Sequence, residues 1–222
     1  MVMYNADGSR GAMCGNGIRC VAKYVYDHKL TDKTTVTIAS MGAVKTIDIQ
    51  VQDGVAVGAS VDMGAPILDP AAIPVVTDCK PPVDVPITVH DTVYKMTCVS
   101  MGNPHAVVFI DRSPREFPLE QVGPLFEHHP RFPDRTNTEF AFVQDRQNIE
   151  MRVWERGSGE TLACGTGACA TAVAAILGGY VDHRVTVHLL GGDLQISWSG
   201  KAEDSVMMTG PATTVFSGKI DL

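Results

Sequence analysis

Residues 155–169 have the sequence ERGSGETLACGTGAC, which predicts a tight turn followed by a helix that begins beside Cys164. The β-branched and apolar residues at 149–154 favour a strand before the turn, and glycines give the turn its backbone freedom. The alanine-rich run at 168–177 favours a helix. Unpaired N–H groups and the helix dipole at such a terminus bind anions and lower the pKa of a thiol. We therefore expect a lowered pKa for Cys164.

A second copy of this arrangement lies near the start of the chain. Residues 13–20 read MCGNGIRC and lead into a helical run that extends to about Asp27. The shift that maps Cys14 onto Cys164 also maps the glycines of the first copy onto those of the second. The duplication predicts two similar halves, each of which presents a thiol at the start of a helix.

Charge and hydropathy narrow the class of protein. The formal net charge is −7 and the sequence has no run of lysine or arginine, so we expect no binding to nucleic acid. No stretch approaches about 18 consecutive apolar residues, so we expect no membrane-spanning segment. The first residues lack the basic and apolar regions of a secretory signal. Together these patterns favour a cytoplasmic protein.

The six cysteines are too sparse for a disulfide framework, and a chain without an export signal favours reduced thiols. The spacings between Cys14 and Cys20 and between Cys164 and Cys169 differ from the usual zinc-ligand spacings, so no metal site is expected. Four cysteines are expected to be small core residues: Cys20, Cys79, Cys98 and Cys169.

Many short strands and one long helix in each half predict an α+β fold, with each central helix wrapped by a mostly antiparallel sheet. The strands are expected near 34–39, 43–51, 55–61, 87–89, 93–99, 106–110, 138–143, 149–154, 185–190, 194–198 and 206–209, with a further short helix at 119–128. We assign residues 1–62 plus 211–222 to the N-terminal half, which carries Cys14, and 63–210 to the C-terminal half, which carries Cys164.

The two halves differ in length ahead of their cysteines. Roughly 75 residues of strands and turns precede the cysteine of the second half, whereas the first half has only the residues before Cys14. We therefore expect the first half to be incomplete, with roughly 50 to 60 residues missing before Met1.

Two thiols on opposite sides of a cleft suit the inversion of a carbon stereocentre. One thiolate removes a proton from one face of the carbon, and a thiol delivers a proton to the other face. Two helix N-termini aimed at a substrate carboxylate stabilise the negative charge that develops. The sequence has neither a dinucleotide-binding glycine motif nor a P-loop, and we expect no cofactor.

The chain resembles the diaminopimelate epimerases in a series of short motifs that occur in order along its whole length. They are NADGS at 5–9, MCGNGIRC at 13–20, GNPH at 102–105, NTEF at 137–140, ERG at 155–157 and ACGTG at 163–167. The resemblance implies two similar α/β halves and the pyridoxal-independent interconversion of LL- and meso-2,6-diaminopimelate, in lysine and cell-wall synthesis.

The resemblance also implies roles for individual residues. Cys14 and Cys164 would be the acid/base thiols, and His105 and Glu155 would assist proton transfer. Substrate contacts would come from Asn5, Gly15, Asn16, Asn103, Asn137, Glu155, Arg156, Gly165 and Thr166. The family's initial His-Gly-x-Gly-Asn-Asp-Phe loop is absent here, in agreement with an incomplete first half. A homodimer is expected for a full-length chain.

Other interpretations fit parts of the pattern. Proline racemase-like enzymes usually have histidine where this chain has Asn16, and phenazine-biosynthesis-like isomerases lack the cysteine pair. A thiol redox protein could form a switchable disulfide between Cys14 and Cys164. A truncated remnant could bind a ligand without turnover. Taken singly, Asn5 and Asn137 could be turn residues, His105 a strand-end histidine, and Glu155 and Arg156 a solvated pair.

Overall fold

The computed structural model describes residues 1–2, 4, 14–40 and 43–219, which form two compact units. Unit 1 comprises Met1–Asp62 with Thr209–Leu222, and unit 2 comprises Met63–Met208. The helices are α1 (Gly15–Asp27), α2 (Leu119–Glu127) and α3 (Gly165–Leu177), with a 3₁₀ turn η1 (Pro114–Glu116). Helices and strands occur in both units, so the predicted α+β class is confirmed.

The strands follow the predicted pattern closely. They are β1 (Thr35–Ser40), β2 (Ala43–Gln52), β3 (Val55–Asp62), β4 (Val85–Val89), β5 (Thr92–Ser100), β6 (Pro104–Phe109), β7 (Asn137–Asp145), β8 (Asn148–Glu155), β9 (Gly159–Thr161), β10 (Arg184–Leu189), β11 (Gly192–Ser197) and β12 (Met207–Pro211). The short strand β9 and the turn η1 were not predicted. β9 pairs antiparallel with β8 directly after the turn at Gly157.

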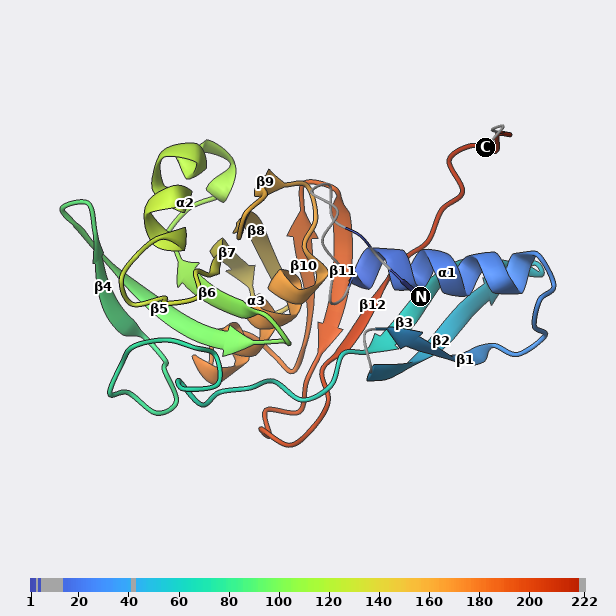
Figure 1. The fold of residues 1–222 in the computed structure, drawn as a ribbon, viewed down its shortest axis with the longest axis horizontal. Coiled ribbons are helices and arrows are strands. Elements are labelled where there is room, and N and C mark those ends of the chain that lie inside the picture. Colours follow the sequence, from blue (N-terminus) through green and yellow to red (C-terminus); the bar gives the residue numbers. More distant parts are fainter. Residues whose placement is uncertain (3, 5–13, 41–42, 220–222) are drawn as a thin grey trace. The chain divides into compact units, whose positions relative to one another are not determined.

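Unit 1 consists of α1 on one face of a small antiparallel sheet (Figure 1). The strand order is β1-β2-β3, and residues 209–211 of β12 lie beside β3. Ile18 and Ala22, one helical turn apart, are fully buried. The end of the helix is tied to β3 by Asp27, whose carboxylate accepts a 2.8 Å hydrogen bond from the backbone N–H of Ala56 and a 2.7 Å bond from Lys23.

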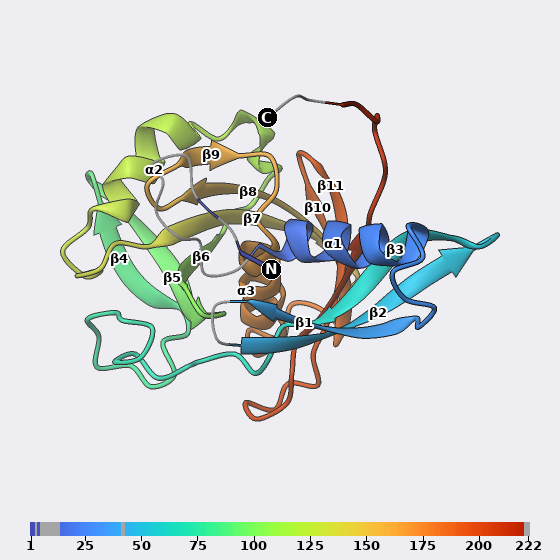
Figure 2. The same cartoon turned by 45° about the vertical axis from the view of Figure 1, so that its right-hand side comes forward.

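Unit 2 is a curved sheet that wraps around α3 (Figures 1 and 2). The strand order is β11-β10-β8-β7-β6-β5-β4, with β9 beside β8. The β6–β7 and β8–β10 pairs are parallel, and the other pairs within this unit are antiparallel. Residues 165–175 of α3 are buried on all sides, which explains why this helix is apolar throughout rather than amphipathic.

The opposite face of the unit 2 sheet is covered by α2. The hydrophobic cluster there includes the ring pair Phe126 and Phe140, which meet edge to face at 5.5 Å. Side chains alternate between the two faces of a strand. Phe140 therefore faces α2, whereas its neighbour Glu139 faces α3. This alternation determines which polar residues reach the first turn of α3.

The prediction that four cysteines belong to the core is correct for Cys98 and Cys169 but wrong for Cys20 and Cys79, which are exposed. Cys20 lies two positions from the buried Ile18, about 200° around the helix, and so points away from the sheet. Cys79 lies in the proline-rich connection between β3 and β4, outside the strands and helices. All six cysteines are free thiols.

Candidate active site

Cys164 is the N-cap residue of α3. Its backbone is extended, with φ −119° and ψ 108°, and its sulfur accepts a 3.4 Å hydrogen bond from the N–H of Gly167. The side chain is buried within unit 2. The predicted position of this thiol at a helix start is confirmed, and the thiol itself caps the helix where Ser or Asp more commonly does.

Cys14 has the same local geometry at the start of α1. Its φ and ψ angles are −134° and 105°, and its sulfur accepts a 3.2 Å hydrogen bond from the N–H of Gly17. Both helices have 13 residues. The two Cys-Gly-x-Gly sequences therefore form the same local structure. In each, the cysteine is the N-cap of a helix, and its sulfur accepts a hydrogen bond from the N–H of the second glycine.

The structure reverses the expected pKa of Cys164. Burial raises the pKa of this thiol, and the negative charges of Glu155 and Glu139 raise it further. Hydrogen bonds from Thr166 and from the N–H of Gly167 lower it, but they do not outweigh the other effects. The prediction of a lowered pKa is therefore wrong for Cys164, which favours the protonated thiol at neutral pH.

A chain of polar contacts connects Cys164 to His105 on β6. The sulfur lies 3.5 Å from Oγ1 of Thr166, which accepts a 3.2 Å hydrogen bond from Nδ2 of Asn103. Oδ1 of Asn103 in turn lies 3.1 Å from Nε2 of His105. The structure thus brings together four residues that the resemblance assigned to the site: Cys164, Thr166, Asn103 from the turn before β6, and His105.

The ring of His105 is completely buried, and Nδ1 donates a 2.7 Å hydrogen bond to Oε1 of Glu139 on β7. Strands β6 and β7 are parallel and in register, with His105 opposite Asn137. Because side chains two apart share a face, Asn137 and Glu139 both point to the α3 side of the sheet. His105 is a strand-end histidine, as one interpretation held, and it also lies within the polar chain of the site.

Asn137 anchors the turn that carries Arg156. Its Oδ1 accepts a 2.9 Å hydrogen bond from the backbone N–H of Arg156, and its Nδ2 donates a 2.8 Å bond to the carbonyl of Pro104. The guanidinium of Arg156 is exposed and donates to the carbonyl of Asp134. Glu155 accepts a hydrogen bond from the hydroxyl of Thr161. Glu155 is thus bound to Thr161, and Arg156 to Asp134.

In unit 1, the predicted site residues Gly15 and Asn16 form the first turn of α1 next to Cys14. Arg19 is buried and donates 3.0 Å hydrogen bonds to the carbonyl of Gly15 and to Oδ1 of Asn16. This guanidinium therefore holds the first turn in place. The remaining predicted contact, Asn5, lies outside the described residues.

Two buried carboxylates of the site were not predicted. Glu139 was part of the NTEF motif, but sequence alone did not place it behind the first turn of α3. Glu127, at the end of α2, accepts hydrogen bonds from Nε1 of Trp154 at 2.7 Å and from the N–H of Gly157 at 2.9 Å. A glutamate at the end of an apolar helix is a weak signal, because most such residues are solvated.

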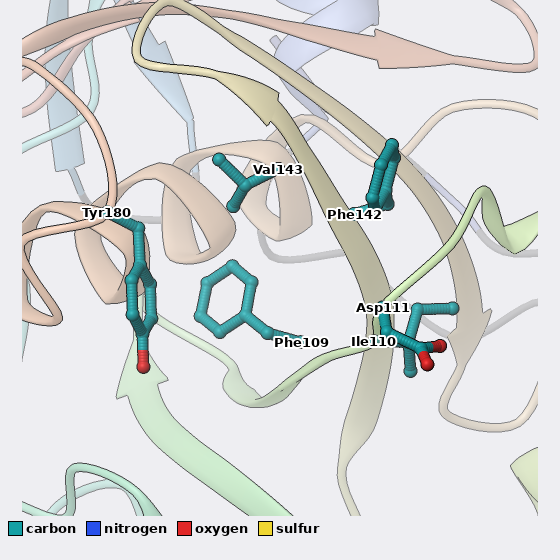
Figure 3. Close-up of a pocket in the computed structure, with 6 residues that line it drawn as sticks. All are labelled: Phe109, Ile110, Asp111, Phe142, Val143 and Tyr180. Carbon is teal, nitrogen blue, oxygen red and sulfur yellow. The ribbon is translucent and has the colours of Figure 1, made fainter.

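A pocket of about 330 Å³ lies away from this site (Figure 3). It is lined by Phe109, Ile110, Asp111, Phe142, Val143 and Tyr180. These residues lie in or just after the C-terminal parts of β6, β7 and α3, whereas His105, Asn137 and Cys164 lie at the N-terminal ends of the same elements. Within the described residues, no group of three or more histidine, cysteine or acidic side chains could hold a metal ion, and no helix is long and apolar enough to cross a membrane.

Comparison of the sequence with known proteins relates the chain to one family. The profile of the family described as diaminopimelate epimerase matches residues 1–68 and 97–215. The diaminopimelate epimerase of Methanococcus maripaludis strain C5 is 54% identical over 222 residues, which are 100% of this chain and 79% of that protein. The diaminopimelate epimerase of Agathobacter rectalis is also 54% identical, over 229 residues, covering 100% of this chain and 80% of that protein.

Solved structures show the same fold at much lower identity. A probable proline racemase from Agrobacterium radiobacter K84 matches with a TM-score of 0.74 and 15% identity, covering 100% of this chain and 71% of that chain. At this identity the likeness establishes the fold alone. The two epimerase relatives, each 54% identical to this chain, show which family the chain belongs to.

Proposed function

The chain belongs to the diaminopimelate epimerase family, and from this premise we propose that it interconverts LL- and meso-2,6-diaminopimelate by a two-cysteine acid/base mechanism. The observation that carries the proposal is the pair of N-cap thiols, Cys14 and Cys164, with the same backbone conformation and the same sulfur–amide contact. Two chemically matched thiols are what an inversion at one carbon requires, since each must serve as acid in one direction and base in the other.

The proposed reaction has two proton transfers and no other covalent change. One thiolate takes the proton from the α-carbon, leaving a carbanion that is stabilised by delocalisation into the carboxylate. The opposite thiol then delivers its proton to the other face of the carbon. The raised pKa of Cys164 supports its role as the proton donor at the start, which leaves Cys14 as the base. After one turnover the two thiols have exchanged roles.

The substrate's carboxylate is proposed to lie at the two helix N-termini. N–H groups of the first turns, including those at Gly15, Gly165 and Thr166, are donors for such an anion, and the helix dipoles favour its charge. The amides of Asn5, Asn16 and Asn103 are proposed as further contacts. These roles are predicted from the resemblance to the diaminopimelate epimerases.

The distal amino-acid end of the substrate is proposed to bind at the turn after β8. Glu155 offers a carboxylate for an ammonium group, and the exposed guanidinium of Arg156 suits a carboxylate, which it can bind bidentately. The buried Asn137 fixes the backbone of this turn. His105 is proposed to assist proton transfer at Cys164 through Asn103 and Thr166.

The decisive experiment compares single cysteine variants of the whole chain. Exchange of the α-proton of LL-diaminopimelate in heavy water, followed by NMR, reports proton removal, and the appearance of the meso isomer reports inversion. Cys14→Ala and Cys164→Ala should each abolish inversion, because one face of the carbon loses its proton carrier. The Ser variants should retain little activity, because a hydroxyl is a far weaker acid than a thiol.

Cys20→Ala and Cys79→Ala are matched controls, since both thiols are exposed and lie outside the site. Both should keep the activity of the unmodified chain. Near-normal inversion by either Cys14→Ala or Cys164→Ala would rule out the two-base mechanism. Added pyridoxal phosphate should change none of these rates, because no cofactor is proposed.

The remaining expectations concern the setting of the enzyme. We propose a cytoplasmic enzyme that supplies meso-diaminopimelate for lysine and peptidoglycan precursor synthesis. Its partner is the small-molecule substrate, without nucleic acid or membrane, and the assembly is proposed to be a homodimer. Light scattering coupled to size exclusion measures the oligomeric state, and a mass of one chain at working concentration would contradict the dimer.

A further inference from the structure

Glu139 is a buried carboxylate that the proposed mechanism does not use. It is the third residue of β7, on the face that packs against α3, and its side chain is inaccessible to solvent. Oε1 accepts the hydrogen bond from Nδ1 of His105, whereas Oε2 has no hydrogen-bond partner among the described residues. Burying a carboxylate with one oxygen unpaired is costly, so its presence needs a reason.

The carboxylate is packed tightly against the first turn of α3. A Cβ atom at Gly167 would lie 2.6 Å from Oε1 of Glu139 and 3.2 Å from the sulfur of Cys164. Only glycine at this position lets both side chains approach the turn so closely. The partial positive charge at the helix N-terminus stabilises an anion placed there. Glu139 and Cys164 therefore share one small space at the start of α3.

Two paths lead from Glu139 to Cys164. The first is the chain of contacts through His105, Asn103 and Thr166, in which each neighbouring pair is 3.5 Å apart or less. The second is electrostatic, because the charge of Glu139 raises the pKa of Cys164, after burial and the charge of Glu155.

We propose that Glu139 is a positioning residue of this site, whose carboxylate fixes the ring of His105 beside Asn103, Thr166 and Cys164. The inference rests on the proposed function, in which Cys164 exchanges a proton with the substrate. The Glu139 carboxylate accepts from Nδ1–H and so fixes the orientation of the ring, with Nε2 facing Oδ1 of Asn103. Glu139 itself is buried behind His105 and touches the reacting atoms only through other residues.

The charge of Glu139 gives this residue a second effect. Three elements of the sheet bring ionisable groups toward Cys164: Glu155 from β8, Glu139 from β7 and His105 from β6. With Glu155 unchanged, removal of the Glu139 charge lowers the pKa of the Cys164 thiol. A residue that served only to fill the core would have no such effect.

The test uses Glu139→Gln in the whole chain, with three measurements. We expect kcat for epimerisation to fall on the order of 10- to 100-fold, since small misplacements at a reacting centre have effects of this size. KM should change much less, because no substrate contact is removed. The ¹⁵N NMR signals of the His105 ring should change, and the midpoint pH for alkylation of Cys164 by iodoacetamide should move downward.

Glu139→Asp separates the two effects and serves if the Gln variant does not fold. It keeps the charge but is one methylene shorter, so the alkylation midpoint of Cys164 should stay near that of the unmodified chain while kcat falls. Glu150→Gln is the matched control, because Glu150 is a largely buried sheet carboxylate whose partner is the exposed Arg115. It should alter neither the His105 signals nor the Cys164 midpoint.

The outcomes distinguish this inference from the proposed function. If Cys164→Ala is active, the proposed function fails whatever Glu139 does. If Cys164→Ala is inactive but folded Glu139→Gln has normal kcat, unchanged His105 signals and an unchanged Cys164 midpoint, only the role of Glu139 is overturned. Normal kcat in Glu139→Asp would likewise overturn the requirement for a carboxylate at this distance from Nδ1.

Discussion

Oδ1 of Asn137 accepts a 2.9 Å hydrogen bond from the backbone N–H of Arg156, while Nδ2 of the same amide donates to the carbonyl of Pro104 at 2.8 Å. One buried side chain thus joins the start of β6 to the turn after β8. The turn carries Glu155 and Arg156, which are proposed to bind the distal end of the substrate. The position of these groups therefore depends on an amide whose two hydrogen bonds, among the described residues, go to backbone atoms.

Replacing this amide should affect binding and stability together. In Asn137→Ala, the N–H of Arg156 and the carbonyl of Pro104 lose their partners, and each unsatisfied buried group costs about 1–3 kcal/mol. We expect a lower free energy of unfolding in urea and a higher KM for diaminopimelate. Asn148→Ala, at the opposite end of β8, should leave KM unchanged. An unchanged KM in Asn137→Ala would show that the turn is held without this amide.

The carboxylate of Glu127 supports the same turn from the other face of the sheet. It accepts from Trp154, from the N–H of Gly157 and, at 3.2 Å, from the half-exposed Arg135. In Glu127→Gln, the amide NH₂ must face one of these donors, so the free energy of unfolding should fall by about 1–3 kcal/mol. KM should rise as the turn loosens. Urea denaturation and steady-state kinetics measure both.

A surface ion pair provides the control for Glu127. Arg146 and Asp182 are 2.7 Å apart, but both side chains are substantially exposed. Arg146→Gln should cost no more than about 1 kcal/mol, because solvent screens exposed pairs. Equal losses of stability in Glu127→Gln and Arg146→Gln would mean that burial of the Glu127 carboxylate has no energetic consequence.

Local sequence predicted the start of α3 well because the information there is local. Glycines on both sides of Cys164 and an alanine-rich run after it leave few alternatives to an N-capped helix. The three-residue strand β9 could not be predicted in the same way, because Gly159 and its neighbours are typical of a turn. A side-chain contact joins the two strands as well: the guanidinium of Arg152 on β8 binds the carboxylate of Glu160 on β9 through two hydrogen bonds of 2.7 and 2.8 Å.

The pKa of Cys164 illustrates what the sequence could not provide. A helix N-terminus lowers the pKa of a thiol, and that much follows from residues 163–167. The opposing charges come from Glu139 and Glu155, which lie on neighbouring strands and reach the thiol only through the pairing of β7 with β8. Burial, the largest effect, also depends on the complete sheet around α3. The sign of the shift is therefore a tertiary property.

Cys98 allows a test of pH-dependent stability. Burial raises its pKa to about 12; the charge of Arg131 opposes this shift, and the charge of Glu139 adds to it. Because the folded pKa exceeds the ordinary value of 9.0, the stability from this thiol is complete below 9.0 and is lost as pH rises toward about 12. The advantage of the unmodified chain over Cys98→Ala should shrink by about 1.4 kcal/mol per pH unit in that range. Urea unfolding at pH 8 and pH 10 measures it, and a constant difference would contradict the shift.

The state of Cys164 in the resting enzyme is the last prediction. Burial and the charges of Glu155 and Glu139 raise its pKa, so at pH 8 it should be protonated and react slowly with iodoacetamide. Cys20 and Cys79 are exposed and should be alkylated before Cys164. Mass spectrometry of the digested protein assigns each modification, and unfolding in urea should make Cys164 as reactive as the exposed thiols. Glu155→Gln should lower the midpoint pH for its alkylation, because one of the two charges that raise the pKa is removed. Rapid alkylation of Cys164 in the folded protein at pH 8 would show that it is a thiolate at rest, and would reverse the proposed assignment of acid and base.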